Sequence, residues 1–333
     1  TPYTSSAASD VYKRQFLGMD EKQVSFVPIS INYEKVLEGN SYINEVMGAE
    51  KKKENLKDIF SVFRDFRNYL GEAYLQFGEP INLNALLKEY PLSDYSSEKD
   101  WLFKVTPVLG KKIMTTINDS TVVTSTALFS LAILNSDGFS ISNRELVSRI
   151  ELLKSLLVED KYSAKTLICE KTGEEIIDQM RKLGFLSKEG INDRISLTNL
   201  EAAKLRFYRY NLSHLLIFES LICGFFQYQK EIVKEDLLQS IKMIYPFLKE
   251  EFFLKWDEAD LDQLINLKLN KLINKNLILE DSNNYKRPDF KSREFYETQS
   301  LGKLVQPSID RFYVLISQLW KNSVEHLSLI HIS

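Results

Sequence analysis

Cysteine is scarce in this sequence, with only Cys169 and Cys223 among 333 residues. They lack metal-ligand spacing and are too few for a disulfide framework, which fits a reducing compartment such as the cytosol. Charge of one sign is not in excess either, because 43 lysines and arginines stand against 46 acidic residues, a net charge of -3. A chain of this composition has no general attraction for polyanions, so we expect no nucleic-acid partner.

A long uncharged apolar run is also missing, since no stretch of about 18 such residues occurs. The nearest approach is residues 212–228, which contain His214 and Glu219. Two ionisable groups inside the hydrocarbon core of a bilayer would cost several kcal/mol. A buried helix is therefore the preferred interpretation, and a hairpin that dips into a membrane is the alternative.

Histidine occurs only at positions 214, 326 and 331. His214 precedes Glu219 at a spacing that resembles the His-x-x-x-x-Asp pair of acyl transfer, with glutamate in place of aspartate. In that chemistry the histidine removes a proton from a hydroxyl group while the carboxylate orients the ring. Residues at this spacing on a continuous helix point about 140° apart. We therefore predict that His214 is a core or interface histidine.

Motifs for cofactors and metals are absent as well. The sequence has no Walker-type loop, dinucleotide-binding glycine pattern, HExxH motif or paired-cysteine site. It therefore predicts no cofactor, no metal site and no catalytic residue. The 44% hydrophobic composition and the length nevertheless fit one large domain or two ordinary ones, each with its own core.

The two ends differ in character from the rest of the chain. Residues 1–15 are small and polar with no apolar segment, which excludes a signal peptide and resembles non-native sequence from a vector or sequencing adapter. Residues 323–333 have a similar look, and there a native amphipathic extension is the alternative. Neither end is expected to carry function.

A strand, a helix and a second strand are expected near the start. Residues 24–33 are rich in β-branched and aromatic side chains, which predicts a buried strand with Pro28 at a bulge or strand end. Residues 56–70 place apolar side chains on one helical face, and residues 73–77 predict the second strand. This order suggests a crossover unit of an α/β sheet.

The polar stretch at residues 91–100 predicts a domain boundary. It divides an α/β part at residues 16–97 from a mainly helical part at residues 98–322. Ser142, with Glu145 three positions later, has the form of a capping box at one helix start. Helices are expected at residues 100–134, 143–158, 173–183, 200–228, 234–253 and 260–274.

Two of these helices precede short alternating segments, residues 185–197 and 277–285, that suggest small hairpins. A helix followed by a hairpin resembles a winged-helix element, which raises the alternative of DNA binding. The helix predicted at residues 173–183 carries three acidic residues against Arg181 and Lys182. A recognition face normally needs several cations, so a structural packing unit is the preferred interpretation.

Six short segments follow one another along the chain in a distinctive order: VPISINYEKV (27–36), GAEKKKENL (48–56), Arg67-Asn68, FGEP (77–80), YRYNLSHLL (208–216) and IYPFLKEEFFLKW (244–256). The first four resemble the last of the four acyltransferase blocks, and the region after that block, in the bacterial membrane-associated glycerol-3-phosphate acyltransferases. The last two resemble the helical C-terminal region of the same enzymes. The likeness extends from residue 24 to residue 275.

The resemblance implies that the full enzyme transfers an acyl group from acyl-CoA or acyl carrier protein to the 1-hydroxyl of glycerol 3-phosphate, in phospholipid synthesis. It also implies a peripheral location at the cytoplasmic face of the inner membrane. In that family the His-x-x-x-x-Asp block and a glycine-rich phosphate-binding block precede the last block. No catalytic role is therefore carried over to this chain, which we expect to be an inactive C-terminal piece.

Substrate-binding residues are implied only in and just after the last block. Pro28, Ile29 and Tyr33 match this block, which the family uses to shape its substrate pocket, and an ordinary buried strand is the alternative. Lys51 and Lys53 are implied to meet phosphates of the acyl donor or of anionic lipids, where each surface lysine contributes about 1 kcal/mol. The alternative for these lysines is a solvated charged turn.

The expected fold is an α/β remnant, the strand-helix-strand edge of an acyltransferase sheet, followed by a mainly α-helical region with small winged-helix-like hairpins. Without partner strands, residues 24–33 should expose apolar side chains. The alternative is that the helical region is a self-standing, non-enzymatic interaction or regulatory module.

Overall fold

The computed structural model describes residues 24–36, 71–186 and 193–330, with side chains up to residue 320. These residues fall into two compact units. The first lies within residues 1–29 and 77–117, and the second within residues 30–76 and 118–333.

The first unit has a small core of its own. Leu86, Trp101 and Val105 are buried together in it, and the Trp101 indole N–H donates to the Tyr90 carbonyl at 2.8 Å. Its elements are β1 (Ser25–Phe26), β4 (Ile81–Asn82), α4 (Leu83–Glu89), η1 (Leu92–Asp94) and most of α5 (Glu98–Asp119), with β1 and β4 paired antiparallel.

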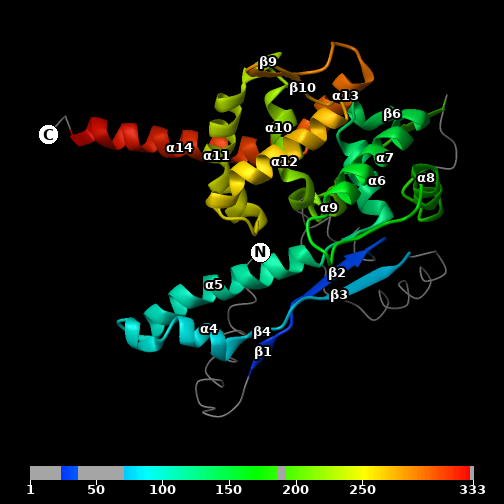
Figure 1. The fold of residues 1–333 in the computed structure, drawn as a ribbon. Helices are drawn as coiled ribbons and strands as arrows, with labels where there is room; N and C mark the ends of the chain where they lie inside the picture. The colour runs from blue at the N-terminus through cyan, green and yellow to red at the C-terminus, as the bar shows by residue number, and fades with distance from the viewer. Residues whose placement is uncertain (1–23, 37–70, 187–192, 331–333) are drawn as a thin grey trace. The chain divides into compact units, whose positions relative to one another are not determined.

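Two strands near the start of the chain lie side by side as a two-stranded sheet (Figure 1). The Glu34 N–H donates to the Glu72 carbonyl at 2.9 Å, and the Gly78 N–H donates to the Pro28 carbonyl at 2.8 Å. Hydrogen bonds in this order make the pair antiparallel. The strands are β2 (Ile29–Tyr33) and β3 (Ala73–Phe77).

This sheet differs in two ways from the predicted α/β edge. The strand predicted at residues 24–33 is divided into β1 and β2, because Pro28 has no N–H to donate to a ladder. A crossover unit joins parallel strands, whereas β2 and β3 are antiparallel. The helix predicted at residues 56–70 lies outside the described residues.

The second unit is mainly helical, as the sequence predicts. Its elements after β3 are β5 (Val122–Val123), α6 (Ser125–Leu134), η2 (Asp137–Phe139), β6 (Ser140–Ser142), α7 (Asn143–Glu159), β7 (Leu167–Ile168), α8 (Gly173–Lys182), β8 (Arg194–Ser196), α9 (Asn199–Tyr210), η4 (Ser213–Leu216), α10 (Ile217–Phe225), β9 (Glu231–Val233), α11 (Lys234–Phe252), η5 (Glu258–Asp260), α12 (Leu261–Asn274), β10 (Leu279–Asp281), β11 (Asn284–Lys286), α13 (Arg293–Gly302) and α14 (Gln306–Ile330).

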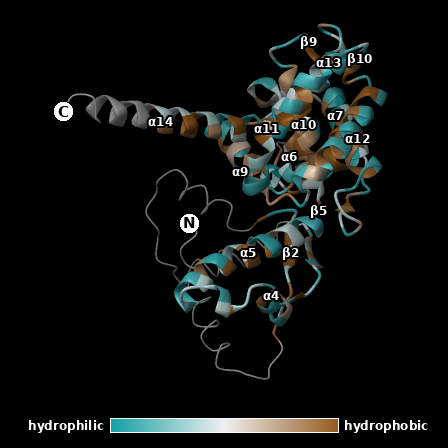
Figure 2. Ribbon diagram, turned by 60° about the vertical axis from the view of Figure 1, so that its left-hand side comes forward, coloured by the Kyte–Doolittle hydropathy of each residue, from teal (hydrophilic) through white to brown (hydrophobic). Residues whose placement is uncertain are grey.

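Two helices form the centre of this unit. Every residue of α6 is buried, and the helix packs against α7, α8 and α9. α10 packs in turn against α11, α12 and α13. A helix enclosed by others needs apolar residues around most of its surface, and the hydrophobic colour is concentrated on these central helices in Figure 2. One continuous hydrophobic core joins the two groups.

Most predicted helix ends are confirmed to within a residue or so, notably those of α7, α8, α11 and α12. The Ser142 hydroxyl accepts a hydrogen bond from the Glu145 N–H at 3.2 Å, which is the first half of the predicted capping box. The Glu145 carboxylate binds Arg149 at 3.0 Å instead of returning to Ser142. Local capping therefore begins α7, and an ion pair within the same helix, four residues apart, takes the Glu145 carboxylate.

Two predicted long helices are wrong because each is interrupted. The helix predicted at residues 100–134 is divided into α5 and α6 by β5, and the one predicted at residues 200–228 is divided into α9 and α10 by η4. Residues 121–124 are all β-branched, which favours extended backbone over helix. Thr124 then caps α6 by accepting from the Ala127 N–H at 3.3 Å.

Three strands form the sheet β10-β11-β9, which contains the second predicted hairpin. Asp281 lies opposite Asn284, so the hairpin turn consists of residues 282 and 283. The first predicted hairpin is different, because β8 pairs antiparallel with β6, earlier in the chain, and residues 187–192 lie outside the described part. The likeness to a winged helix is not confirmed.

The last helix, α14, extends away from the helices that it follows in the second unit (Figure 1). Ile316, Leu319 and Trp320 on this helix are exposed. Within the described part of the chain, no helix combines the length and the apolar character that a membrane span requires.

Candidate functional site

The substrate-binding residues predicted from the sequence lie partly on β2. Pro28 is buried just before this strand, whereas Ile29 and Tyr33 are 39% and 42% exposed. Lys51 and Lys53 lie outside the described residues. The exposure of Ile29 and Tyr33 agrees with the apolar exposure expected of this strand without partner strands, and the role of these residues in a substrate pocket stays a prediction.

The two faces of β2 have the reverse of the usual polarity. Ser30, Asn32 and Glu34 are buried, while Ile31 and Tyr33 are exposed. The polar side is internally satisfied in part, since the Asn32 amide donates to the Ser30 hydroxyl at 2.9 Å. An exposed apolar strand face commonly marks a surface that another element covers.

Glu34, directly after β2, connects this strand to helices α6 and α8 through hydrogen bonds. Its carboxylate accepts a hydrogen bond from the Ser125 N–H at 3.1 Å, in the first turn of α6, and another from the Gln179 amide on α8. Its carbonyl accepts from the Thr126 hydroxyl at 2.7 Å. A carboxylate at a helix N-terminus is favoured by the unpaired N–H groups and the helix dipole.

The environment of Glu34 acts on its ionisation in opposite directions. Burial raises the pKa of the Glu34 carboxyl above its usual value, and this effect outweighs the hydrogen bond from Ser125, which lowers it. Gly71 lies close to the same side chain, and a Cβ at this position would come within 2.5 Å of the Glu34 Cβ. The geometry indicates that Glu34 has a structural role, in which it connects β2 to the N-terminus of α6.

The residues after Glu34 continue the attachment. The Lys35 ammonium donates to the Leu183 carbonyl at 2.8 Å, and the Val36 N–H donates to the Tyr208 hydroxyl at 2.8 Å. Val36 and Tyr208 belong to two of the separate segments that carry the family resemblance. The structure therefore brings these two segments into direct contact, which the sequence alone did not predict.

His214 is a buried core residue, as predicted. Only 5% of it is exposed, its Nε2 lies 3.3 Å from the Thr121 hydroxyl, and its ring meets Tyr162 edge-on at 5.1 Å. Burial lowers the pKa of His214 to about 4. The imidazole is therefore neutral near pH 7 and has no carboxylate partner among the contacts of the described residues.

Glu219 points instead to two lysines on α12. Its Oε1 lies 2.5 Å from the Lys271 Nζ and 3.1 Å from the Lys268 Nζ, and Asp160 also pairs with Lys268. Burial opposes ionisation of Glu219, which is 1% exposed, but the two lysines prevail and lower its pKa. His214 and Glu219 therefore do not pair with each other, and their spacing in the sequence does not indicate a catalytic dyad.

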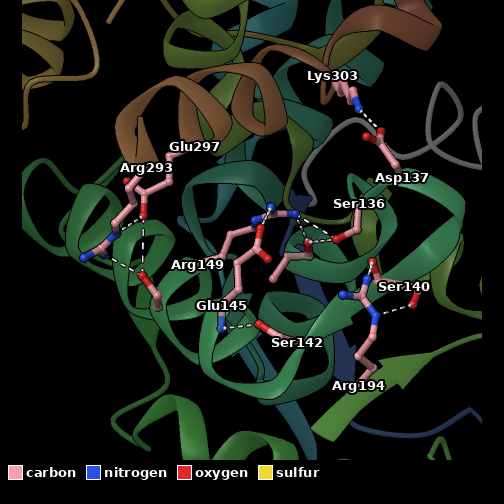
Figure 3. Close-up of polar contacts among 12 residues, drawn as sticks. Ser136, Asp137, Ser140, Ser142, Glu145, Arg149, Arg194, Arg293, Glu297 and Lys303 are labelled. Atoms are coloured by element: carbon pink, nitrogen blue, oxygen red, sulfur yellow. Dashed lines mark hydrogen bonds and ion pairs between the residues drawn. The ribbon is translucent and has the colours of Figure 1, made fainter. Parts of the chain in front are cut away.

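A polar cleft of 610 Å³ lies among η2, β6, the start of α7 and α13 (Figure 3). Arg149 lies at the centre of the drawn contacts and is only 7% exposed. Its guanidinium donates to the Ala132 carbonyl at 3.1 Å, the Ser136 hydroxyl at 2.8 Å and the Glu145 carboxylate at 3.0 Å. Burial lowers the pKa of Arg149, against the opposing effect of nearby carboxylates.

Further cations surround Arg149 in this cleft. Arg194 on β8 donates to the Ser140 carbonyl at 3.2 Å and to the Ser140 hydroxyl at 3.3 Å. Arg293 and Lys303 come from α13 and the residue directly after it. Their partners are Glu297, 2.9 Å from Arg293, and Asp137, 2.6 Å from Lys303, whose ammonium lowers the pKa of the Asp137 carboxyl.

The sequence alone gave no indication of this cleft. Its cations come from positions as far apart as Arg144 and Lys303, and no motif joins them. The capping pattern at Ser142 was the one local feature that pointed to this part of the chain. Glu34 was missed for the same reason, because its partners on α6 and α8 are distant in sequence.

Comparisons with known proteins identify the family. Residues 42–329 match the glycerol-3-phosphate acyltransferase C-terminal region. The glycerol-3-phosphate acyltransferase of Pseudomonas putida (strain GB-1) is 30% identical over 323 residues, which cover 95% of this chain and 39% of that relative. The enzyme of the same name from Pseudomonas aeruginosa (strain LESB58) is 30% identical over 315 residues, 92% of this chain and 38% of the relative.

The chain thus spans about two fifths of the length of the curated relatives that it matches. The matched residues include all of the helical body from β5 to α13. The resemblance drawn from the ordered segments is confirmed, and the chain belongs to the glycerol-3-phosphate acyltransferase C-terminal region family.

Proposed function

We propose that this chain is part of an enzyme that transfers an acyl group from acyl-CoA or acyl carrier protein to the 1-hydroxyl of glycerol 3-phosphate, in phospholipid synthesis. The observation that carries the proposal is the family match, together with the name shared by relatives that align with 95% of the chain. The catalytic groups are assigned to the part of the relatives that the chain does not cover.

β2 and β3 are proposed to be an edge of the catalytic sheet. Support comes from the reversed polarity of β2, whose apolar Ile31 and Tyr33 are exposed and suited to contact further protein. Pro28, Ile29 and Tyr33 then contribute to the wall of the substrate pocket. The division into an acyltransferase part and a helical part near residue 98, and the winged-helix likeness of the helical part, also remain proposals.

Lys51 and Lys53 are proposed to meet phosphates of the acyl donor or of anionic lipids, and the enzyme is placed at the cytoplasmic face of the inner membrane. The exposed Ile316 and Trp320 of α14 support a surface association, because such side chains favour the membrane interface. Each lysine at an anionic surface contributes about 1 kcal/mol.

A chimera tests the proposal. The C-terminal two fifths of the Pseudomonas putida relative are replaced by this chain, and acyl transfer to glycerol 3-phosphate is measured. We expect the chimera to be active and the isolated chain to be inactive. A well-folded but inactive chimera, or activity of the chain alone, would contradict the proposal.

Tyr33→Ala in the chimera tests the role of β2. A residue in the pocket wall should change the KM for one of the two substrates more than it changes the melting temperature. The matched control is Tyr228→Ala, which removes an exposed tyrosine next to α10. If both substitutions change the KM to the same extent, Tyr33 does not line the substrate pocket.

A non-enzymatic regulatory module is the second candidate. It is not favoured, because the helical region itself lies within the matched acyltransferase family region.

A further inference from the structure

The polar cleft beside α7 has a surplus of positive charge. Among its described lining residues, five cations stand against three carboxylates, although the chain as a whole is acidic. The cations are Arg144, Arg149, Arg194, Arg293 and Lys303, and the carboxylates are Asp137, Glu145 and Glu297.

Three of these cations are already neutralised. Arg149 pairs with Glu145 at 3.0 Å, while Arg293 and Lys303 pair with the other two carboxylates. Two arginines therefore remain without a carboxylate partner among the contacts of the described residues. They are Arg144, in the first turn of α7, and Arg194, on β8.

Arg194 is nevertheless held in place. Two of its guanidinium nitrogens donate to Ser140, one to the hydroxyl and one to the carbonyl, and neither acceptor carries a charge. The two hydrogen bonds to Ser140 orient the guanidinium (Figure 3), and neither of them pairs it with a carboxylate. A positioned guanidinium with free donors is the side chain best suited to a phosphate group.

Most of the other residues that line the cleft are of polar type. Hydroxyl groups of Ser136, Ser142, Ser148 and Ser300 line the cleft, and its apolar members are Ile141 and Tyr296. Its volume of 610 Å³ exceeds that of a bare phosphate and falls within the usual range for small-molecule sites. The charged and hydroxyl-bearing residues suit an anion, and the volume leaves room for an organic part attached to it.

We propose that this cleft binds a phosphate monoester, with Arg194 and Arg144 as the residues that hold the phosphate. Arg149, fixed at the base by three acceptors, adds to the positive potential of the site. The ester is either a soluble metabolite or the headgroup of a lipid. The proposal does not depend on the proposed acyl transfer, because binding alone tests it.

Two binding measurements on the whole chain test the site and separate the two sources. Inorganic phosphate is titrated by calorimetry at low salt, and co-sedimentation is measured with phosphatidylcholine vesicles with and without phosphatidate. We expect Arg194→Gln to weaken phosphate binding about tenfold, as the loss of a charge-assisted hydrogen bond implies. The double variant Arg144→Gln/Arg194→Gln should abolish the binding.

The controls separate binding from folding. Arg144 and Arg194 are exposed, so both variants should keep the wild-type melting temperature. Arg206→Gln removes an exposed arginine of α9 outside the cleft and should bind like the wild type. Arg194→Lys keeps the positive charge but lacks the planar guanidinium with its paired N–H donors. It should therefore bind phosphate more tightly than Arg194→Gln and less tightly than the wild type.

Phosphate binding that depends on Arg194 supports the proposal with a soluble ester as the source. Sedimentation that requires both phosphatidate and Arg194, without binding of free phosphate, supports it with a lipid headgroup as the source. Absence of both effects, or equal binding by the wild type and the double variant, would overturn it. Neither result changes the activity expected of the chimera.

Discussion

His214, Glu219 and Glu34 are buried ionisable residues of the second unit, and each has a different kind of partner. The partners are a threonine hydroxyl for His214, two lysines for Glu219 and the N-terminus of α6 for Glu34. Burial of an ionisable group is unfavourable without such partners. These positions should therefore be among the most sensitive to substitution and to pH.

His214 should make the stability of the second unit pH-dependent. Its pKa falls from 6.5 to about 4 on folding, so the unfolded chain binds the proton more readily than the folded one. Stability is then fully present above pH 6.5 and is lost as the pH falls toward 4. Between pH 7 and pH 5 the linkage relation gives a loss of about 2 kcal/mol from this group.

Urea unfolding of the wild type and of His214→Gln at pH 7 and pH 5 measures this loss. The variant lacks the titrating group, so its free energy of unfolding should fall by about 2 kcal/mol less than that of the wild type over this interval. Identical pH dependence in the two proteins would show that His214 does not titrate in this way.

Glu219→Gln should be strongly destabilising. The substitution leaves Lys268 and Lys271 buried with one carboxylate fewer, and breaking a buried ion pair of this kind costs about 3 to 5 kcal/mol. Asp262→Asn is the matched control, since it breaks a partly exposed pair with Lys242 and should cost under about 1 kcal/mol. Urea unfolding at pH 7 measures both variants. Similar losses in the free energy of unfolding would contradict a stabilising role for the buried ion pairs of Glu219 with Lys268 and Lys271.

At the scale of elements, α10 and α13 approach each other through Gly302. A Cβ at this position would lie 2.9 Å from the backbone of Cys223 and of Gly224. The contact is completed by Ser220, whose hydroxyl donates to the Leu301 carbonyl at 2.8 Å and accepts from the Val305 N–H at 2.9 Å. Glycine is therefore required by close packing and not by backbone conformation.

Gly302→Ala should lower the stability by about 1 to 3 kcal/mol through overpacking. Gly224→Ala provides a matched control on the facing helix, because its Cβ would have no neighbour closer than 3.8 Å. Alanine there should be neutral or stabilise α10 by up to about 1 kcal/mol. Thermal unfolding of the two variants tests this prediction. Equal melting temperatures would contradict the close approach of α13 to α10 at Gly302.

At the scale of the molecule, the two units have unequal cores. The first buries a small cluster around Trp101, whereas the second buries one core that extends from β5 to α13 and beyond. Stability depends strongly on the apolar area buried. The first unit should therefore unfold at a lower denaturant concentration than the second.

The sequence contains three tryptophans, and Trp256→Phe/Trp320→Phe leaves Trp101 as the only one. Its fluorescence should report an unfolding transition in urea that precedes the main loss of helical circular dichroism. The wild type, in which Trp256 packs against Tyr162 and Phe218, should show both phases by fluorescence. Coincident transitions in the variant would mean that the whole chain unfolds as one cooperative unit.

Local chemistry was enough to predict many helices and their ends. The periodicity of α7, α8, α11 and α12, and the cap at Ser142, depend on residues a few positions apart. The same reasoning failed at residues 121–124, where a short β-branched stretch separates two helical patterns. The ordered family segments were recognisable for a similar reason, since each is contiguous in the chain.

Contacts between distant residues decided the rest. The β-branched and aromatic side chains of β2 indicated a strand, but which of its faces is buried depends on Glu34 reaching α6 and α8. The arginines of the cleft come together only after β8 pairs with β6 and α13 packs nearby. Periodicity and capping are short-range properties that a sequence records directly, whereas burial and the meeting of charges arise only when the elements pack.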